Sequence, residues 1–257
     1  MVFGNYAHYY NLLYRDKDYK GEVDYIQKLI TQFSTNKVES ILDLGCGTGT
    51  HVNLLSQKGY SVAGVDRSQK MIDMAKTHET DLMEFFVGDI TTINLEKQFD
   101  VIVSLFHVIS YITKNDDLEA FFKNISRHLK NEGLLIFDCW YGPAVLTDRP
   151  ATRIKRLEDE KITMTRIAEP VMHPNENIVD VRYEVIIEDK VTKKTDRILE
   201  VHPMRYFFKP EMELFFERYG FELLQSEEWM TGKPVGFDTW GACWVVKKSG
   251  STKGMMQ

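Results

Sequence analysis

Short apolar runs alternate with amphipathic segments through the first half of the chain. Helical periodicity marks residues 23–33 and the stretches between the runs. The alternation of strand and helix predicts a mostly parallel sheet with helices on both faces. The predicted buried strands are the apolar runs at residues 38–44, 60–65, 83–87, 99–105 and 133–139.

Local signals set the ends of the helices between these strands. Residues 50–58 are predicted to be helical, with Gly59 as the stop. Ser68 is expected to cap a helix that reaches about His78. Asn115 or Asp116 is expected to cap another helix that runs to Lys130.

The pattern changes after residue 150. Residues 150–208 alternate with period 2 in places, which indicates antiparallel strands, and residues 190–194 have the composition of a turn. Helical periodicity returns at 211–219 and stops at Gly220. Two closing strands are predicted at residues 221–229 and 240–247.

These patterns predict a Rossmann-like α/β core that is interrupted by a small antiparallel β insertion. The expected parts are an N-terminal helical lid (1–35), the core (36–145), the insertion (146–208), the C-terminal part of the core (209–248) and a flexible tail (249–257). The insertion is expected to contact a substrate or a second subunit.

Composition narrows the classes of partner. The chain has 257 residues and a net charge of −6, which disfavours nucleic acid because phosphate binding depends on Lys and Arg. An apolar run approaching the ~20 residues needed to cross a bilayer is absent from the sequence. Three distant cysteines without a Cys-x-x-Cys pair predict reduced thiols, no metal site and a cytoplasmic location.

Residues 41–49, Ile-Leu-Asp-Leu-Gly-Cys-Gly-Thr-Gly, join the first predicted strand to a helix. Their glycines permit a tight turn and let a ligand press against the main chain. Three acids sharpen this signal, because each lies at or near the end of a different predicted strand. Asp43 is placed to accept from an amino group, Asp66 to hold ribose hydroxyls, and Asp89 to meet the amino group of adenine.

Residues 40–140 resemble the class I methyltransferases that depend on S-adenosylmethionine (SAM), with Asp-Leu-Gly-Cys-Gly-Thr-Gly at the centre. The resemblance implies a seven-stranded sheet whose last strand is antiparallel, methyl transfer from SAM, and S-adenosylhomocysteine as the product. The cofactor-binding residues that it implies are Tyr14, Tyr19, Asp43, Gly45, Cys46, Gly47, Gly49, Asp66, Arg67, Met71, Asp89, Ile90 and Phe106.

Residues 14–19, 106–111 and 138–143, followed by a β insertion, are similar to the N-methyltransferases of nucleotide-linked amino sugars. Those enzymes dimethylate a sugar amine, so the resemblance implies such an acceptor here. Two positions depart from that pattern. Tyr111 stands where some members have a histidine, and Gly142 stands in place of a larger aromatic residue, which is expected to alter the acceptor pocket.

An amine acceptor must lose a proton, and Tyr111, His107 and Asp138 are the candidate bases. Trp140 and Tyr141 follow the fifth strand, where ligands bind in such sheets, and are expected to form a substrate wall. Arg205 is a candidate contact for an acidic or phosphorylated acceptor, with a surface salt bridge as the alternative.

Five tyrosines near the N-terminus either form a lid beside a cationic sulfonium or simply pack a helix on the sheet, namely Tyr6, Tyr9, Tyr10, Tyr14 and Tyr19.

Other classes of function fit the sequence less well. A nicotinamide-dependent dehydrogenase would use the glycine loop and Asp66, but it gives Asp43 and Asp89 no role. Nucleic-acid methyltransferases often carry an Asn/Asp-Pro-Pro-aromatic loop, whereas residues 104–107 are Ser-Leu-Phe-His. A non-catalytic SAM-binding protein is opposed by the intact motifs. Another small acceptor, and a monomer or a homodimer, are compatible with the sequence.

Overall fold

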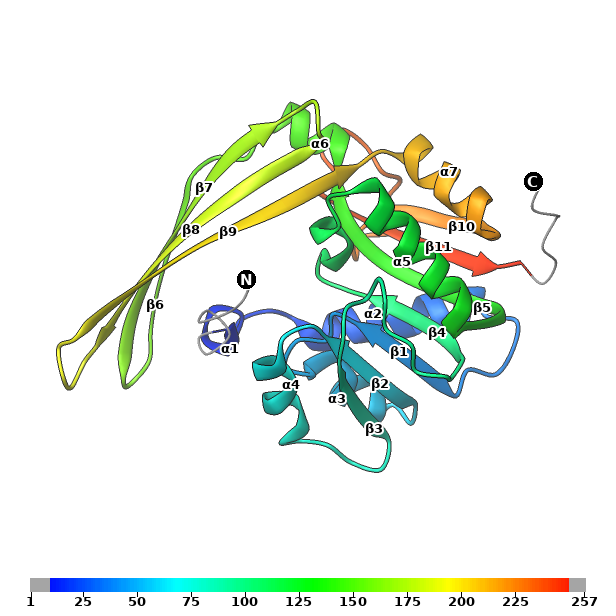
Figure 1. The fold of residues 1–257 in the computed structure, drawn as a ribbon, viewed down its shortest axis with the longest axis horizontal. Helices are drawn as coiled ribbons and strands as arrows, with labels where there is room; N and C mark the ends of the chain where they lie inside the picture. The colour runs from blue at the N-terminus through cyan, green and yellow to red at the C-terminus, as the bar shows by residue number, and fades with distance from the viewer. Residues whose placement is uncertain (1–9, 250–257) are drawn as a thin grey trace.

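The computed structural model describes residues 10–249, apart from the side chains of Tyr10 and Asn11. Tyr6, Tyr9 and the predicted tail from residue 250 lie outside the described residues, as does the side chain of Tyr10. Within the described chain, eleven strands form one hydrogen-bonded sheet. Its core runs in the order β3-β2-β1-β4-β5-β11-β10 (Figure 1). The bounds are β1 Ser40–Leu44, β2 Ser61–Asp66, β3 Met83–Val87, β4 Phe99–Ser104, β5 Leu129–Tyr141, β10 Phe221–Glu228 and β11 Gly241–Lys248.

Strands β1 to β5 pair in parallel, whereas β11 is antiparallel to both β5 and β10. The predicted seven-stranded, mostly parallel core is therefore confirmed. Parallel strands of this kind are covered on both faces, which is why their sequences are continuously apolar. Within residues 10–249, no helix combines the length and the apolarity needed to cross a membrane.

Each face of the core sheet has its own hydrophobic cluster, because neighbouring strand residues point to opposite sides. Ile41 and Ile136 pack on one face, and Leu42 and Phe137 on the other. Helices α2, α3 and α4 supply residues to the first cluster, and α5 and α7 supply residues to the second. The helices are α2 Tyr19–Phe33, α3 Thr50–Gln57, α4 Gln69–Lys76, α5 Asn115–His128, α6 Gly142–Thr147 and α7 Lys209–Tyr219.

The predicted antiparallel region is a four-stranded arm that extends well beyond the core (Figure 1). It consists of β6 Arg153–Glu158, β7 Ile162–His173, β8 Ile178–Asp189 and β9 Thr195–Phe207. The end of β9 runs parallel to β5, with Tyr206 and Phe207 paired to Trp140 and Tyr141, so the arm is anchored at the edge where β5 ends. Helix α1, Tyr10–Leu13, packs against the arm through Leu13.

Two boundary predictions around α5 are wrong. The N-cap residue is Lys114, whose side chain forms no capping bond, and Asn115 is already helical. The helix ends at His128 instead of Lys130, because the chain enters a β5 strand that begins early and is irregular. Glu132 has φ 62°, and this local change of direction is not visible in the apolar pattern.

Gly142 opens α6, and its neighbour is Phe208. A Cβ atom at position 142 would lie 2.5 Å from Cζ of Phe208, so the phenyl ring occupies the space that a larger residue would need. Neither residue lines the cavity described below. Gly142 therefore has a role in packing against Phe208, and the expectation that it shapes the acceptor pocket is not supported.

We expect Gly142→Ala to lower the free energy of unfolding by about 1–3 kcal/mol, because an extra methyl group overpacks a filled site. Urea denaturation with matched m-values would measure the loss. Adding Phe208→Leu should recover part of it, since the smaller side chain makes room. Equal stability of the single variant and the wild type would contradict this account.

Candidate active site

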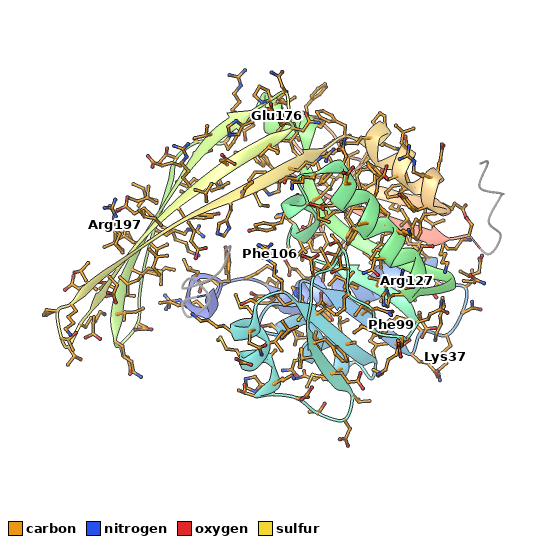
Figure 2. All side chains as sticks on the ribbon, viewed as in Figure 1. Lys37, Phe99, Phe106, Arg127, Glu176 and Arg197 are labelled. Carbon is orange, nitrogen blue, oxygen red and sulfur yellow. The ribbon has the colours of Figure 1, made fainter. Side chains whose placement is uncertain are left out.

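A cleft of about 350 Å³ lies where the carboxyl ends of the parallel strands meet. It is bounded by the loops after β1, β2, β3 and β4, by the end of β5, and by β8 and β9 of the arm. Phe106 lies near the middle of the molecule, between the core and the arm (Figure 2). Fourteen of the residues predicted from the sequence line the cleft, namely Tyr14, Tyr19, Gly45, Cys46, Gly47, Asp66, Arg67, Met71, Asp89, Ile90, Phe106, His107, Tyr111 and Trp140.

The glycine loop between β1 and α3 forms one wall of the cleft. Gly45, Gly47 and Gly49 all have positive φ (87°, 55° and 79°), a conformation that side chains with a Cβ atom rarely adopt. Backbone N–H groups of Gly45 and Cys46 donate to the carbonyl of Val65, which fixes the loop against β2. A Cβ at Gly47 would meet no described atom within 4 Å, so a ligand has open access to this main chain. Gly49 lies outside the lining and caps α3.

Asp66 ends β2 and faces the cleft. Its Oδ1 accepts from the Ser68 N–H at 2.8 Å and its Oδ2 accepts from the Gly47 N–H at 3.0 Å. Burial raises the pKa of Asp66, although these two hydrogen bonds lower it. The carboxylate thus orders two loops while it remains part of the cleft lining. Asp89 also lines the cleft, but it is exposed and accepts from both the N–H and the hydroxyl of Thr91.

Asp43 lies in β1 beneath the cleft and does not line it. Its Oδ2 is buried and has no hydrogen-bond partner among the residues that the structure describes. Burial is the main cause that raises the pKa of Asp43 to about 6, and the charge of Asp66 adds to the effect. His51 and Lys17 act in the opposite direction. An unsatisfied acceptor next to the glycine loop fits a ligand that brings a cationic donor.

The N-terminal segment contributes Tyr14 and Tyr19 to the lining of the cleft. The ring of Tyr14 meets Phe106 edge-on with centroids 5.0 Å apart. The Lys17 ammonium lies 4.3 Å from the ring centroid of Tyr19 and 4.4 Å from that of Phe106. These two aromatic rings therefore hold a cation, the ammonium of Lys17.

A buried ion-pair cluster ties this segment to the core. Glu22 contacts Lys17, and its Oε2 lies 2.7 Å from His51 Nε2 on α3. Burial raises the pKa of Glu22, but the hydrogen bonds from His51 and Lys17 outweigh it and lower the pKa. Tyr19 begins α2 and its ring meets His51 edge-on, so its position in the cleft lining depends on the same contacts that pack α2 onto α3.

The loop after β4 is held in an unusual backbone conformation. Phe106 and His107 have φ values of 68° and 61°, which are strained for residues other than glycine and typical of functional sites. The His107 N–H donates to both oxygens of Asp138 at 3.1 Å. His107 Nδ1 is 2.7 Å from Asp138 Oδ2, but the angle is not that of a hydrogen bond. Asp138 is fully buried behind the lining, so it positions this loop and does not face the cleft.

Aromatic residues surround the end of the cleft nearest the arm. Trp140 lies near the end of β5, Tyr111 lies in the short 3-10 helix η2 at Val108–Tyr111, and Tyr183 lies in β8. Met204 of β9 also lines this end of the cleft. Burial raises the pKa of Tyr183 to about 12, which keeps its hydroxyl neutral. The arm therefore supplies part of the wall that the core leaves open.

Two predicted substrate residues lie elsewhere. Tyr141 is buried against Trp244, outside the cleft lining. Arg205 pairs with Glu211 and donates to the carbonyl of Thr113, and these contacts join β9 to α7 and to the loop before α5. The alternative prediction for Arg205, a salt bridge, fits this position, although Arg205 is buried and Glu211 is half-buried instead of both lying on the surface.

Sequence reasoning missed twelve lining residues. The glycine motif offered a signal for those of the first loop, and the alternating pattern placed Tyr183 in a strand. No local signal indicated that the arm folds back over the cleft. The missed residues are Thr48, Thr50, His51, Ser68, Gly88, Thr91, Leu105, Val108, Ile112, Asp117, Tyr183 and Met204.

Comparisons with known proteins agree with this geometry. Residues 41–133 match a family described as "Methyltransferase domain". The chain is 26% identical over 234 residues, which are 90% of this chain and 94% of the relative, to dTDP-3-amino-3,4,6-trideoxy-alpha-D-glucopyranose N,N-dimethyltransferase of Streptomyces venezuelae. It is 25% identical to dTDP-3-amino-3,6-dideoxy-alpha-D-glucopyranose N,N-dimethyltransferase of Streptomyces fradiae, over 91% of this chain and 88% of that one.

The fold is also found among solved structures. An S-adenosylmethionine-dependent methyltransferase from Clostridium acetobutylicum superimposes with a TM-score of 0.81 at 24% identity. The match covers 97% of this chain and 100% of that one, so it includes the arm.

Proposed function

We propose that this chain is a class I methyltransferase that depends on S-adenosylmethionine, and that it methylates the amine of a nucleotide-linked amino sugar. The observation that carries the proposal is similarity over nearly the whole chain, arm included, to relatives named for N,N-dimethylation of dTDP-amino sugars. The aromatic wall of Trp140, Tyr111 and Tyr183 supports it, because flat rings suit the apolar face of a sugar.

SAM, when bound, supplies a methyl group that its sulfonium has already made electrophilic. The residues of this chain then provide position and a dry environment. We propose that the Asp66 carboxylate holds the ribose hydroxyls, that Asp89 and Ile90 flank the adenine, and that Asp43 faces the amino group behind the glycine loop. The remaining members of the proposed cofactor site are Tyr14, Tyr19, Gly45, Cys46, Gly47, Gly49, Arg67, Met71 and Phe106.

The acceptor side of the site lies between the β4 loop and the arm. His107, Tyr111 and Trp140 face the cleft here, and Asp138 supports His107 from behind. This arrangement favours Tyr111 and His107 over Asp138 as groups that reach an acceptor. It supports a division in which residues 36–145 hold the cofactor and residues 146–208 contact the substrate.

We further propose that the enzyme acts in the cytoplasm on a free small molecule and not on nucleic acid, as a monomer or a homodimer. The net charge of −6 supports the absence of a nucleic-acid partner. Gel filtration with light scattering would give the oligomeric state.

The test is turnover of SAM with a panel of dTDP-linked amino sugars, with product masses read by mass spectrometry. We expect one or two methyl groups on the amine, and none on the matched sugar with a hydroxyl in its place. Trp140→Ala is expected to lower kcat/KM for the sugar by about 10- to 100-fold with unchanged SAM affinity. A protein that binds SAM and leaves every amino sugar unmodified would overturn the proposal.

A further inference from the structure

A row of three hydrogen-bonded side chains leads from the cleft into the arm. Tyr111 lines the cleft, and its Oη is 3.1 Å from Nδ1 of His202 on β9. The other ring nitrogen of His202, Nε2, is 3.0 Å from Glu200 Oε2. His202 is only 1% exposed, so the imidazole exchanges protons through these neighbours and not directly with bulk water.

Packing fixes the imidazole in this row. The ring of Tyr183 on β8 meets His202 edge-on with centroids 4.8 Å apart, and the ring of Tyr111 lies 5.8 Å away at 62°. Strand pairing adds to the constraint, because His202 is opposite Val181 and Glu200 is opposite Tyr183. The three polar groups are therefore held in line by two strands and by η2.

The partners determine which nitrogen carries the proton. A carboxylate only accepts, so Nε2 donates to Glu200 and Nδ1 is left as the acceptor for the Tyr111 hydroxyl. A phenol oxygen that donates in one direction retains lone pairs with which it can accept from another group. Tyr111 can therefore receive a proton on its oxygen as it passes its own to His202.

Burial and two neighbouring cations favour the neutral form of His202. Burial is the largest cause that lowers the pKa of His202, and Arg67 and Arg166 lower it further. Glu200 acts in the opposite direction without prevailing. Arg166 reaches this region from β7 and lies over the ring of Tyr183, whose own pKa is raised by burial. A neutral imidazole can take up one proton, and Glu200 stabilises the cation once it forms.

We propose that Tyr111, His202 and Glu200 form a proton relay that takes the proton from the acceptor amine. This inference rests on the proposed function. Tyr111 is the catalytic residue that touches the acceptor, and His202 and Glu200 are positioning residues that act through it.

The amine nitrogen forms a bond to the methyl carbon as the carbon–sulfur bond breaks, which leaves a neutral thioether and a cationic, methylated nitrogen. That nitrogen releases a proton to Tyr111 Oη, and the Tyr111 proton moves to His202 Nδ1. The imidazolium then faces the Glu200 carboxylate, and the proton returns to solvent when the product leaves.

The test compares Tyr111→Phe, His202→Asn and Glu200→Gln with the wild type, through kcat on a dTDP-linked amino sugar from pH 6 to 10. Tyr111→Phe keeps the ring and its packing. His173→Asn is the matched control, because His173 also pairs with an acid on the arm, Asp180 at 3.0 Å, but lies outside the cleft lining.

We expect Tyr111→Phe and His202→Asn to lower kcat at pH 7.5 by about 10²-fold, with unchanged SAM affinity, and to recover as pH rises and hydroxide replaces the base. Glu200→Gln should move the acidic limb of the profile to lower pH, because the imidazolium loses its counter-charge. His202→Gly should regain activity with added imidazole, which a merely structural histidine would not allow. His173→Asn should stay within twofold of the wild type.

The outcomes separate this inference from the proposed function. If the wild type methylates the amine and Tyr111→Phe has the same kcat and pH profile, the relay is wrong and the proposed function stands. If the wild type binds SAM and methylates no amine, both fail.

Discussion

Asp66→Ala is expected to weaken SAM binding by about 10²-fold or more. A ribose diol can donate two charge-assisted hydrogen bonds to this carboxylate, and each such bond contributes roughly 1.5–3 kcal/mol. Asp66 also accepts from the Gly47 N–H, so alanine releases the glycine loop at the same time. Isothermal titration calorimetry with SAM and with S-adenosylhomocysteine would measure the loss.

Two matched variants test whether the weaker SAM binding comes from the carboxylate of Asp66 itself. Asp66→Asn keeps an oxygen for the Gly47 N–H but loses the charge and one acceptor, so we expect an intermediate loss of about tenfold. Asp73→Ala removes an exposed carboxylate on the nearby α4 and should bind SAM like the wild type. Unchanged affinity in Asp66→Ala, or micromolar binding of NADH instead of SAM, would refute the assigned role.

Asp43→Asn is expected to stabilise the ligand-free protein and to impair SAM binding. The folded-state pKa of Asp43 is about 6, above its ordinary value of 3.8. Folding therefore favours the protonated form, and the associated stability is complete below pH 4 and lost as pH rises through 6. At pH 7.5 the buried charge destabilises the protein by roughly 3 kcal/mol, since each pKa unit corresponds to about 1.36 kcal/mol.

Asparagine removes this charge, so the free energy of unfolding should rise by about 1–3 kcal/mol at pH 7.5 and change little at pH 4. Urea titrations at both pH values would measure the difference. A cationic amino group of SAM favours ionised Asp43, so wild-type affinity should fall roughly tenfold per unit below pH 6, and the variant should lack that dependence. Parallel stability curves for the two proteins between pH 4 and 7.5 would contradict the account.

The core could be predicted from sequence because its signals are local. Apolar runs such as residues 83–87 form strands, Ser68 caps α4, and Gly220 ends α7 in the left-handed conformation that glycine tolerates. Predictions failed where the chain changes direction without a compositional signal, as at Glu132, whose positive φ belongs to an irregular start of β5.

The cofactor side of the cleft followed from the same rules, because parallel strands end at one edge and bring their loops together. Gly47, Asp66 and Asp89 are far apart in the chain, and all three line the cleft. On the acceptor side, His107, Tyr111 and Trp140 followed as well, but the residues that the arm contributes did not. Tyr183 and Met204 belong to strands whose residues alternate between the two faces of a sheet, and this pattern does not say which face meets the cleft. The sequence around Arg205 likewise does not indicate which acid it contacts.

The sequence by itself determined the parallel core, the glycine loop and the acids at the strand ends, because each depends on local residue patterns within or next to single strands and helices. Only the tertiary structure decided that the arm folds over the cleft, that Tyr141 and Arg205 are directed away from it, and that His202 meets Tyr111 across 91 positions. Such contacts arise from long-range packing between β9, β5 and η2, and no local pattern of residues encodes them.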